Sequence, residues 1–415
     1  MTTKINNEHK KLNVPNLRFK EFQGEWEKTT IGEIATIKNG PFGSVLHAED
    51  YVDEGMPIVT TEHFKSGNLP LSKNGIPQVS EDDYCRLKGY MLETDDIVFS
   101  RVGSVDINAH VEHVQQGWLF SGRVLRVRPI KSVNSLCLHY VLSTESVKRD
   151  IRNRAVGQTM PSINTPILSN TGIYMSQSEA EQKKIANLLS LIDERISTQN
   201  KIIDKLQSLI KGLNDSLYAQ YGGKVLTSFA ELGTSYSGLS GKSAQDFGSG
   251  KPFITYLNVY SNNVINENEF QYVAIKDDEK QNVAEYGDVL FTLSSETPRE
   301  VGIGSVYLGK EKVYLNSFCF GIHITNMEVA FPPYLSYYVS STAFRKFIYP
   351  YAQGSTRFNL CKADFEKASI KLPTLENQKR IYSILSHIDN KIITERQMLD
   401  LYNSQKQYLL RQMFI

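Results

Sequence analysis

The sequence lacks the cysteine pairs that build zinc sites and disulfide frameworks. Its four cysteines are widely separated and none belongs to a Cys-x-x-Cys motif: Cys85, Cys137, Cys319 and Cys361. We expect ordinary buried or half-buried thiols at these positions. His110 and His113 lie three residues apart, but no convincing third ligand accompanies them. The sequence therefore predicts no metal site.

Long apolar runs and an excess of one charge are also absent. No run of about 18 apolar residues occurs, so no transmembrane helix is expected. Residues 1–15 are polar and lack the apolar core of a secretory signal, which favours the cytoplasm. The formal net charge is only +1. If the chain binds nucleic acid, its basic groups must be clustered, or partner subunits must supply part of the phosphate contact.

Motifs that would indicate catalysis fail in detail. The segment Phe331-Pro332-Pro333-Tyr334 resembles the loop of amino-methyltransferases, but a phenylalanine cannot accept hydrogen bonds from a target amine. The segment Gly241-Lys242-Ser243 resembles the end of a phosphate-binding loop, but Tyr236 stands where the first glycine is required. No nuclease-type Asp…Glu-x-Lys arrangement is found. The sequence predicts no catalytic site.

What the sequence does contain is a unit of roughly 200 residues that occurs twice. Residues 157–218 and 354–414 share a glycine at the start and a Gln-x-x-Ile segment further on, at an offset of 196 or 197. The equivalent pairs are Gly157 and Gly354, Gln182 and Gln378, Ile185 and Ile381, and Asp193 and Asp389. Upstream, residues 30–34, 96–99 and 140–144 resemble residues 228–232, 288–291 and 338–342, in the same order. The offset drifts where loops are expected, which indicates a shared framework with variable loops.

The second part of each repeat has the alternating three- and four-residue spacing of a coiled-coil seam. In the first copy the apolar seam includes Ile185, Leu189, Ile192, Ile196, Ile203 and Leu206. In the second copy it includes Ile381, Leu385, Ile388, Ile392, Leu399 and Leu409. Gln199 and Glu395 interrupt the two seams at equivalent positions, where a buried polar group would disfavour slipped registers. Each seam is about 48 Å long.

An isolated helix with such a seam would expose an apolar stripe, so it needs a partner. The two copies are available to each other within one chain, and pairing between two chains is the alternative. The seam alone does not choose the orientation. We expect the antiparallel pair, which would place two globular domains at opposite ends of a rod.

Between the helices the pattern changes to short β-rich runs bounded by Gly, Pro, Asn and Asp. Examples are residues 97–100, 122–128, 289–292 and 320–324. Residues 140–149 and 334–347 each predict one short helix. The expected fold class is α/β (α+β), with two similar globular domains, two long antiparallel coiled-coil helices and a pseudo-twofold internal repeat.

The repeat also predicts the domain boundaries. The expected segments are a flexible tail (1–16), a first globular domain (17–155), a first spacer (156–220, helix about 178–218), a second globular domain (221–353) and a second spacer (354–415, helix about 375–413).

Several short segments carry a resemblance to one family. Leu17-Arg18-Phe19 with Phe22 and Trp26, and then Gly40-Pro41-Phe42-Gly43-Ser44, resemble the opening of type I specificity subunits. The turn at residues 96–101 resembles their Gly-Asp-Ile-Leu-like element, although Asp95 replaces the glycine that the second copy keeps as Gly287. Glu181-Gln182 resembles the start of their spacer helices, and the second copy departs with Asn377. Over nearly its whole length the chain resembles the specificity (S, or HsdS) subunit of bacterial type I restriction-modification enzymes.

The resemblance implies a non-catalytic subunit that recognises a bipartite target in double-stranded DNA, with one half-site per target-recognition domain. The helices would set the unread gap. Two methyltransferase subunits, which use S-adenosylmethionine to methylate adenine, and two restriction/translocase subunits, which use ATP and Mg²⁺, would assemble on it. No cofactor is expected in this chain.

Elementary energetics agree with such an arrangement. Each mismatched base pair costs about 1–3 kcal/mol, so two linked domains together discriminate far better than one. A seam of about 48 Å exceeds the length of one DNA turn, about 34–36 Å, so it could present two domains to successive major grooves.

The candidate DNA-binding residues are mostly cations in predicted loops and strand ends. Arg101 follows a strand in a glycine-containing loop, from which an arginine can bond guanine or a phosphate. Arg126 and Arg128 share one strand face and Arg123 lies on the other. The full set is Lys38, Asn39, Phe42, Ser44, Arg101, Arg123, Arg126 and Arg128 in the first domain, and Lys242, Lys251, Ser295, Arg299 and Arg357 in the second. The alternative for each is a solvated surface side chain, and for Phe42 a loop anchor.

Two other functions compete with DNA recognition. A two-lobed protein–protein scaffold without DNA specificity would suit the near-neutral charge. An enzyme is the third possibility, and it would have to transfer methyl groups from S-adenosylmethionine without partners.

Overall fold

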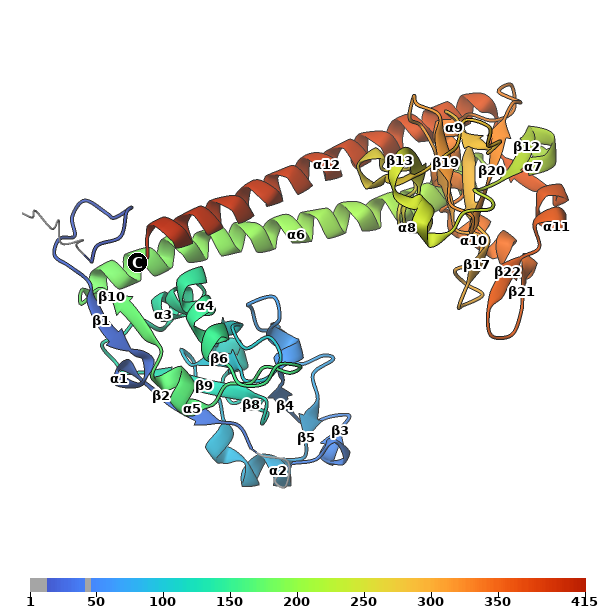
Figure 1. The fold of residues 1–415 in the computed structure, drawn as a ribbon. Coiled ribbons are helices and arrows are strands. Elements are labelled where there is room, and N and C mark those ends of the chain that lie inside the picture. Colours follow the sequence, from blue (N-terminus) through green and yellow to red (C-terminus); the bar gives the residue numbers. More distant parts are fainter. Residues whose placement is uncertain (1–12, 42–45) are drawn as a thin grey trace, which may run out of the picture. The chain divides into compact units, whose positions relative to one another are not determined.

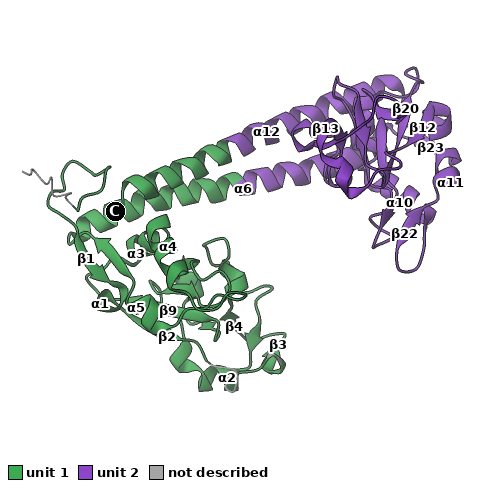
Figure 2. Cartoon of the chain, viewed as in Figure 1, with its two compact units in different colours: residues 1–199, 398–415 green, residues 200–397 purple. Residues whose placement is uncertain are grey.

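The computed structural model describes residues 13–41 and 46–415 (Figure 1). The chain divides into two compact units (Figure 2). Unit 1 contains residues 1–199 and 398–415, and unit 2 contains residues 200–397. This division follows packing and cuts both long helices, whereas the boundaries expected from the sequence follow the ends of the repeats.

Unit 1 is built from three sheets and a set of short helices. The sheets run, in strand order, β1 (Glu27–Thr30) with β10 (Gly172–Met175); β2 (Ala35–Asn39), β9 (Val124–Pro129), β6 (Ile97–Ser100) and β7 (Asn108–His110); and β3 (Tyr51–Val52), β5 (Gln78–Val79), β4 (Met56–Val59) and β8 (Leu119–Phe120). The helices are α1 (Ile31–Ile34), α2 (Glu81–Arg86), α3 (Ser135–Leu142), α4 (Glu145–Arg154), α5 (Thr165–Ser169) and the first part of α6 (Glu179–Tyr221).

Unit 2 repeats this plan with one added sheet. The sheets run β11 (Val225–Thr227) with β23 (Ile370–Leu372); β12 (Gly233–Ser237), β20 (Cys319–Ile324), β16 (Val289–Thr292) and β18 (Gly304–Val306); β14 (Gln271–Val273), β13 (Phe247–Ile254), β19 (Val313–Leu315) and β15 (Val283–Ala284); and β17 (Ser294–Ser295), β22 (Phe358–Leu360) and β21 (Ala352–Gln353). The helices are α7 (Phe229–Leu232), α8 (Tyr256–Ser261), α9 (Pro332–Tyr338), α10 (Thr342–Ile348), α11 (Lys362–Lys367) and most of α12 (Leu375–Gln412).

In each unit the four-stranded sheet that contains β6 or β16 carries a core on both faces. The residues of β6 and β16 are buried throughout, as their continuous apolar runs require. Phe99 packs in the unit 1 core and Phe291 in the unit 2 core. The expected mixed α and β fold with a duplicated globular domain is confirmed.

The seam residues of the two long helices are buried or half-buried at every predicted position. Ile192 is only 5% exposed and Ile392 6%. Gln199 and Glu395, the polar residues of the two seams, are also buried. The heptad pattern therefore identified the apolar stripes correctly.

The two helices run antiparallel within each unit. In unit 1, Asp193 of α6 forms an ion pair with Lys406 of α12 at 2.6 Å, and Arg195, further along α6, lies over the ring of Tyr402, earlier in α12. In unit 2, Arg380 near the start of α12 lies over the ring of Tyr221 at the end of α6. The expected antiparallel orientation is confirmed, and the two helices belong to one chain.

Repeated hydrogen bonds define which residues are equivalent. The Gln182 side chain accepts from Asn134 N at 2.7 Å and donates to Ser176 O at 2.7 Å. Gln378 accepts from Phe331 N at 2.8 Å and donates to Pro373 O at 2.9 Å. Each glutamine therefore fastens the start of its long helix to the strand-to-helix turn of its unit.

A tyrosine–aspartate bond repeats in the same way and corrects one detail of the sequence alignment. Tyr140 donates to Asp193 at 2.8 Å, and Tyr337 donates to Asp389. The partner of Tyr140 is thus Tyr337 and not Tyr338, as the resemblance of residues 140–144 to residues 338–342 had suggested.

The one short helix expected in each domain is two helices in the structure. In unit 1 the chain breaks between α3 and α4 at Ser143-Thr144, and in unit 2 between α9 and α10 near Ser341. The Ser341 hydroxyl accepts from Phe344 N and caps a new helix, which is a position that serine prefers. The prediction of a single helix was wrong because in each unit the chain leaves the helical conformation after about two turns and then starts a second helix.

Residues from both ends of the described chain complete unit 1. Leu17 N donates to Gln412 O at 2.8 Å, and the rings of Trp26 and Phe414 meet edge to face at 6.0 Å. Arg18 forms two hydrogen bonds, 2.7 and 2.8 Å, with the buried carboxylate of Glu181. These contacts explain the Leu17-Arg18-Phe19 segment. In unit 2 the position of Glu181 is taken by Asn377, and no arginine bonds to its side chain among the described residues.

We expect Phe414→Ala to lower the free energy of unfolding of unit 1 by about 3 kcal/mol, because it leaves a cavity in the core against Trp26. Urea unfolding followed by tryptophan fluorescence measures the change. Leu401→Ala, on the same helix but 70% exposed, serves as the control and should change stability by less than about 0.5 kcal/mol. Equal effects of the two variants would contradict the packing described.

Among the described helices, none combines the length and the apolar character that crossing a bilayer would need.

Candidate nucleic-acid interface

The central sheet of unit 1 brings two of the predicted cations side by side. Lys38 on β2 is the direct partner of Arg126 on β9. The Lys38 ammonium donates to Gly89 O at 2.7 Å and lies 4.7 Å from the centre of the Tyr90 ring. Burial and the neighbouring charge of Arg128 lower the pKa of Arg126. The Arg126 Nε and the carboxamide oxygen of neighbouring Asn39 are buried without a hydrogen-bond partner among the described residues.

Arg128 is held by carboxylates of its own unit. Its guanidinium makes two bonds to the buried Asp96, at 2.6 and 2.8 Å, and one to Glu93 at 2.6 Å. The hydrogen bonds that Arg128 donates to Asp96, together with the charge of Asp96, raise the pKa of Arg128. In unit 2 the equivalent aspartate, Asp288, bonds Tyr236 and His323 instead. Arg128 therefore joins β9 to the turn before β6, and a DNA contact by it stays a prediction.

Arg101 and Arg123 meet on neighbouring loops. Arg101 N donates to Arg123 O at 2.9 Å, and the Arg101 guanidinium donates to Gly122 O at 3.1 Å. The Arg123 side chain is exposed. Two residues that are 22 positions apart in the sequence thus form one cationic surface.

The five predicted residues of unit 2 do not form one group. Lys242 is 8% exposed and bonds Glu279 and Ala274 O, and Lys251 is exposed on β13. Arg299 is exposed, and its carbonyl accepts from Arg345 at 2.6 Å. Ser295 and Arg357, in contrast, line the same cavity of about 420 Å³.

This cavity is lined mainly by residues that the sequence search missed. Tyr256 and Tyr260 of α8 stack at 6.0 Å, and Phe318 lies under the Arg357 guanidinium at 5.8 Å. Glu300 accepts hydrogen bonds from Tyr260 at 2.7 Å and from Ser295 at 3.0 Å. These bonds lower the pKa of Glu300, so the carboxylate is ionised at neutral pH. A search for cations could not find tyrosines spaced four apart, which usually indicate a core helix.

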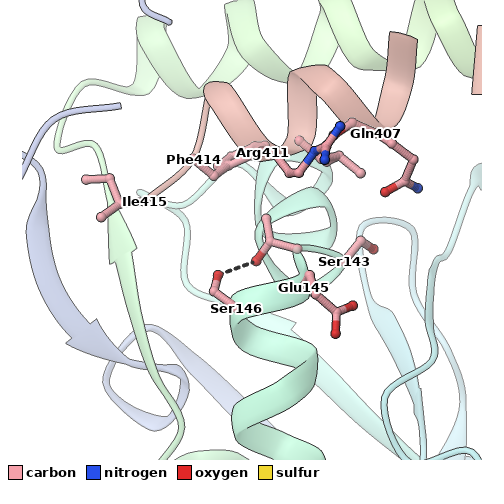
Figure 3. Close-up of a pocket in the computed structure, with 9 residues that line it drawn as sticks. Ser143, Glu145, Ser146, Gln407, Arg411, Phe414 and Ile415 are labelled. Carbon is pink, nitrogen blue, oxygen red and sulfur yellow. Dashed lines mark hydrogen bonds between the residues drawn. The ribbon is translucent and has the colours of Figure 1, made fainter. Parts of the chain in front are cut away.

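A second cavity, of about 510 Å³, lies where the end of α12 meets the start of α4 in unit 1 (Figure 3). It is lined by residues 143–146 and by the C-terminal side chains Gln407, Leu410, Arg411, Phe414 and Ile415. The Thr144 and Ser146 hydroxyls bond each other at 3.1 Å. None of the predicted DNA-binding residues lines it, so it is not the candidate interface.

Two predicted DNA-binding residues and the prediction about metal sites remain. Phe42 and Ser44 lie outside the described residues. Within residues 13–41 and 46–415, no group of three or more His, Cys, Asp and Glu side chains is placed to hold a metal ion.

Comparison with known proteins identifies the family of both repeats. A family model for the type I restriction modification DNA specificity domain matches residues 23–208 and again residues 234–401. A putative type I restriction enzyme MjaX specificity subunit of Methanocaldococcus jannaschii is 27% identical, covering 94% of this chain and 92% of the relative. The MjaVIII specificity subunit of the same organism is 25% identical over 49% of this chain.

Solved structures share the fold. The S subunit of the type I restriction-modification system of M. genitalium has a TM-score of 0.56 at 15% identity, covering 97% of this chain and 99% of that one. A chain from a structure of the type I system that describes complex assembly and conformational transition has a TM-score of 0.53 at 15% identity, covering 93% and 96%.

Proposed function

The chain belongs to the type I restriction modification DNA specificity family, and on that premise we propose that its two units each recognise one half of a bipartite DNA target. It is a specificity subunit, which is a non-catalytic part of its enzyme. The observation that supports two half-sites is the duplication: each unit holds one copy of the DNA specificity domain on the same hydrogen-bonded framework. Double-stranded DNA is the expected ligand of both.

The long helices would set the number of unread base pairs between the half-sites. The helix α6 has 43 residues and α12 has 38. At about 1.5 Å per residue, α6 extends for about 64 Å, which is longer than one turn of DNA. A spacer has to be stiff, and the buried seams of the two helices support this proposed role.

The outer surfaces of the same helices would bind the partner subunits. Leu401 is 70% exposed, Leu191 56% and Tyr408 52%, although all three lie on helices of a folded unit. Leu401 and Tyr408 lie seven residues apart and so on the same face of α12, where neighbouring exposed apolar side chains suit a protein interface. We propose that the helices bind two methyltransferase subunits, and that two restriction/translocase subunits complete the enzyme. The partners would carry S-adenosylmethionine, ATP and Mg²⁺.

The experiment that tests this function is a genome-wide map of methylated adenines in cells with and without the chain. We expect a two-part methylated sequence with a fixed gap that disappears when the chain is absent. Because the chain is nearly neutral, phosphate contacts by the partners should contribute to affinity. A gel shift with and without methyltransferase subunits separates the alternative, since a protein-only scaffold would shift DNA in neither case.

A further inference from the structure

Two pairs of equivalent backbone hydrogen bonds place the same loops together in both units. Arg101 N donates to Arg123 O at 2.9 Å in unit 1, and Leu293 N donates to Phe318 O at 2.9 Å in unit 2. The next residue pairs repeat as well, with Ser121 N to Val59 O at 2.9 Å and Asn316 N to Ile254 O at 3.0 Å. Arg123 and Phe318 therefore occupy the same position on the same backbone.

A hairpin closes each of these surfaces. In unit 1, Ile163 N donates to Arg101 O at 2.9 Å, and in unit 2, Leu360 N donates to Leu293 O at 2.8 Å. Each hairpin turns at a glycine with positive φ, 101° at Gly157 and 139° at Gly354. A Cβ on Gly354 would lie 2.1 Å from Arg357 O, so the turn requires glycine.

A third segment borders each surface, and in the chain it comes directly after one strand of an equivalent parallel pair. The pair is β4 with β8 in unit 1 and β13 with β19 in unit 2. A threonine then starts a short helix in both units, Thr60 before residues 61–64 and Thr255 before α8. In consequence Glu62 and Leu257 are equivalent, and so are Lys65 and Tyr260.

On this shared backbone the exposed side chains differ in kind. We call Glu62, Lys65, Arg101, Arg123 and Met160 the charged site, and Tyr256, Leu257, Tyr260, Phe318 and Arg357 the aromatic site. The tip of the hairpin carries Met160 in the charged site and Arg357 in the aromatic site. The cation and the apolar side chain have thus changed places between two equivalent positions, Arg123 with Met160 and Phe318 with Arg357.

Solvent exposure shows that this difference is not a repacked core. Leu257 is 69% exposed, Phe318 55% and Met160 63%. Large apolar side chains gathered at the surface around a cavity indicate a binding site. The backbone hydrogen bonds and the turn glycine are kept in both units, whereas the side chains that face outward are not. Such a pattern is expected where each unit must select a different ligand of one class.

From this pattern we infer that the charged site and the aromatic site contact the base edges of the two half-sites, and that their different side chains make the half-sites different. This inference rests on the proposed function, which supplies double-stranded DNA as the ligand. Arginine can form two bonds to guanine O6 and N7, so the charged site suits a guanine. The aromatic site, with Leu257 and Phe318 at its rim, suits the methyl group of thymine.

The buried side of the aromatic site adds a polar group for the neighbouring base. Glu300 accepts from the hydroxyls of Tyr260, Ser295 and Thr297. A carboxylate has about four lone-pair positions, so one is left for an amino group of cytosine or adenine. Because an ionised carboxylate repels phosphates, the site fits a base edge better than the backbone.

The test is the methylated sequence directed by variants of the full chain in cells that hold its methyltransferase subunits. Leu257→Ala and Phe318→Ala should relax the base choice at one position of one half-site by roughly tenfold. Arg123→Ala should relax one position of the other half-site by a similar factor. Leu226→Ala is the matched control, since Leu226 is 67% exposed in unit 2 away from the cavity; it should leave both half-sites unchanged.

The outcomes separate the inference from the proposed function. An unchanged sequence with both aromatic-site variants, or an even loss of methylation over all positions, would overturn the assignment, since an even loss indicates phosphate contact. Relaxation of the same half-site by Leu257→Ala and by Arg123→Ala would also overturn it. If the unaltered chain directs no two-part methylation at all, the proposed function itself fails. An intact second half-site in each variant shows that the chain has folded and assembled.

Discussion

Removing one heptad from each long helix should shorten the gap between the two methylated half-sites by about three base pairs, while both half-site sequences stay the same. Seven helical residues correspond to about 10 Å, and base pairs follow each other every 3.4 Å or so along the duplex. Residues 203–209 of α6 and 390–396 of α12 are suitable. Each deletion keeps the three–four spacing of its seam, and the contacts that show the antiparallel pairing place the two segments opposite each other.

A deletion in α6 alone is the informative control. It would leave α12 one heptad too long, so apolar seam residues would face the wrong partners, and we expect loss of the folded chain. The variant Leu209→Ala changes an exposed residue in the same segment and should leave the gap unaltered. If the paired deletion supports methylation with the original gap, the helices do not act as the spacer.

Replacing Arg18 with alanine should destabilise unit 1 by about 3–5 kcal/mol, which is the usual effect of leaving a buried charge without its partner. The Glu181 side chain is fully buried, and Arg18 holds it through two bonds. Denaturant unfolding of the isolated chain measures the loss. Lys184→Ala is the matched control, because its ion pair with Glu21 joins the same segments but is about half exposed and should contribute less than about 1 kcal/mol.

The pH dependence gives this prediction a second readout. Burial alone would raise the pKa of Glu181, but the hydrogen bonds from Arg18 and Ser176 and the charge of Arg18 lower it below its ordinary value. A lowered pKa means that the pair stabilises the fold above the pKa of the unfolded chain and loses its effect as the pH falls through the folded value. In the Arg18→Ala variant, burial raises the pKa of Glu181. Protonation of Glu181 at low pH then removes the buried unpaired charge, so the variant is destabilised less in acid. The difference between the two proteins should therefore shrink as the pH falls below about 5; a constant difference would contradict a charge effect.

The sequence predicted the long helices well because their pattern is local. A seam of apolar residues every three or four positions is visible without knowing what it packs against, and each predicted seam residue is buried or half-buried. The orientation of the pair is not local, since it depends on contacts such as Asp193 with Lys406, more than 200 residues apart. The equivalence of Tyr140 with Tyr337 likewise could be assigned only from a hydrogen bond in the structure, because the sequence alone does not distinguish Tyr337 from the adjacent Tyr338.

A substituted glycine shows how the structure explains a departure from the family pattern. Asp95 stands where the second copy has Gly287, and both residues have positive φ, 71° and 92°. Aspartate is one of the few residues other than glycine that tolerate this conformation. The turn is thus kept in both units, and the substitution needs no change of fold.

The proposed interface could be predicted only in part from the sequence. Choosing cations in loops found Arg101, Arg123 and Arg357, which the structure places at equivalent surfaces of the two units. It did not select Tyr256 and Phe318, because neither carries charge and because they come together through the parallel pairing of β13 with β19, whose paired residues are 61 positions apart. Sequence reasoning also included Lys242 and Arg128, whose charges are paired with carboxylates inside their own units.

The use of both chain ends in unit 1 has a consequence for the order of events during synthesis. Unit 2 is one continuous segment, so it can fold as soon as residues 200–397 have left the ribosome. Unit 1 is begun first but finished last, because Leu409, Leu410, Met413 and Phe414 belong to its core. Until residues 409–414 have left the ribosome, the apolar surface that they cover stays exposed, so the first-made part of unit 1 waits for its core until after unit 2 has been made.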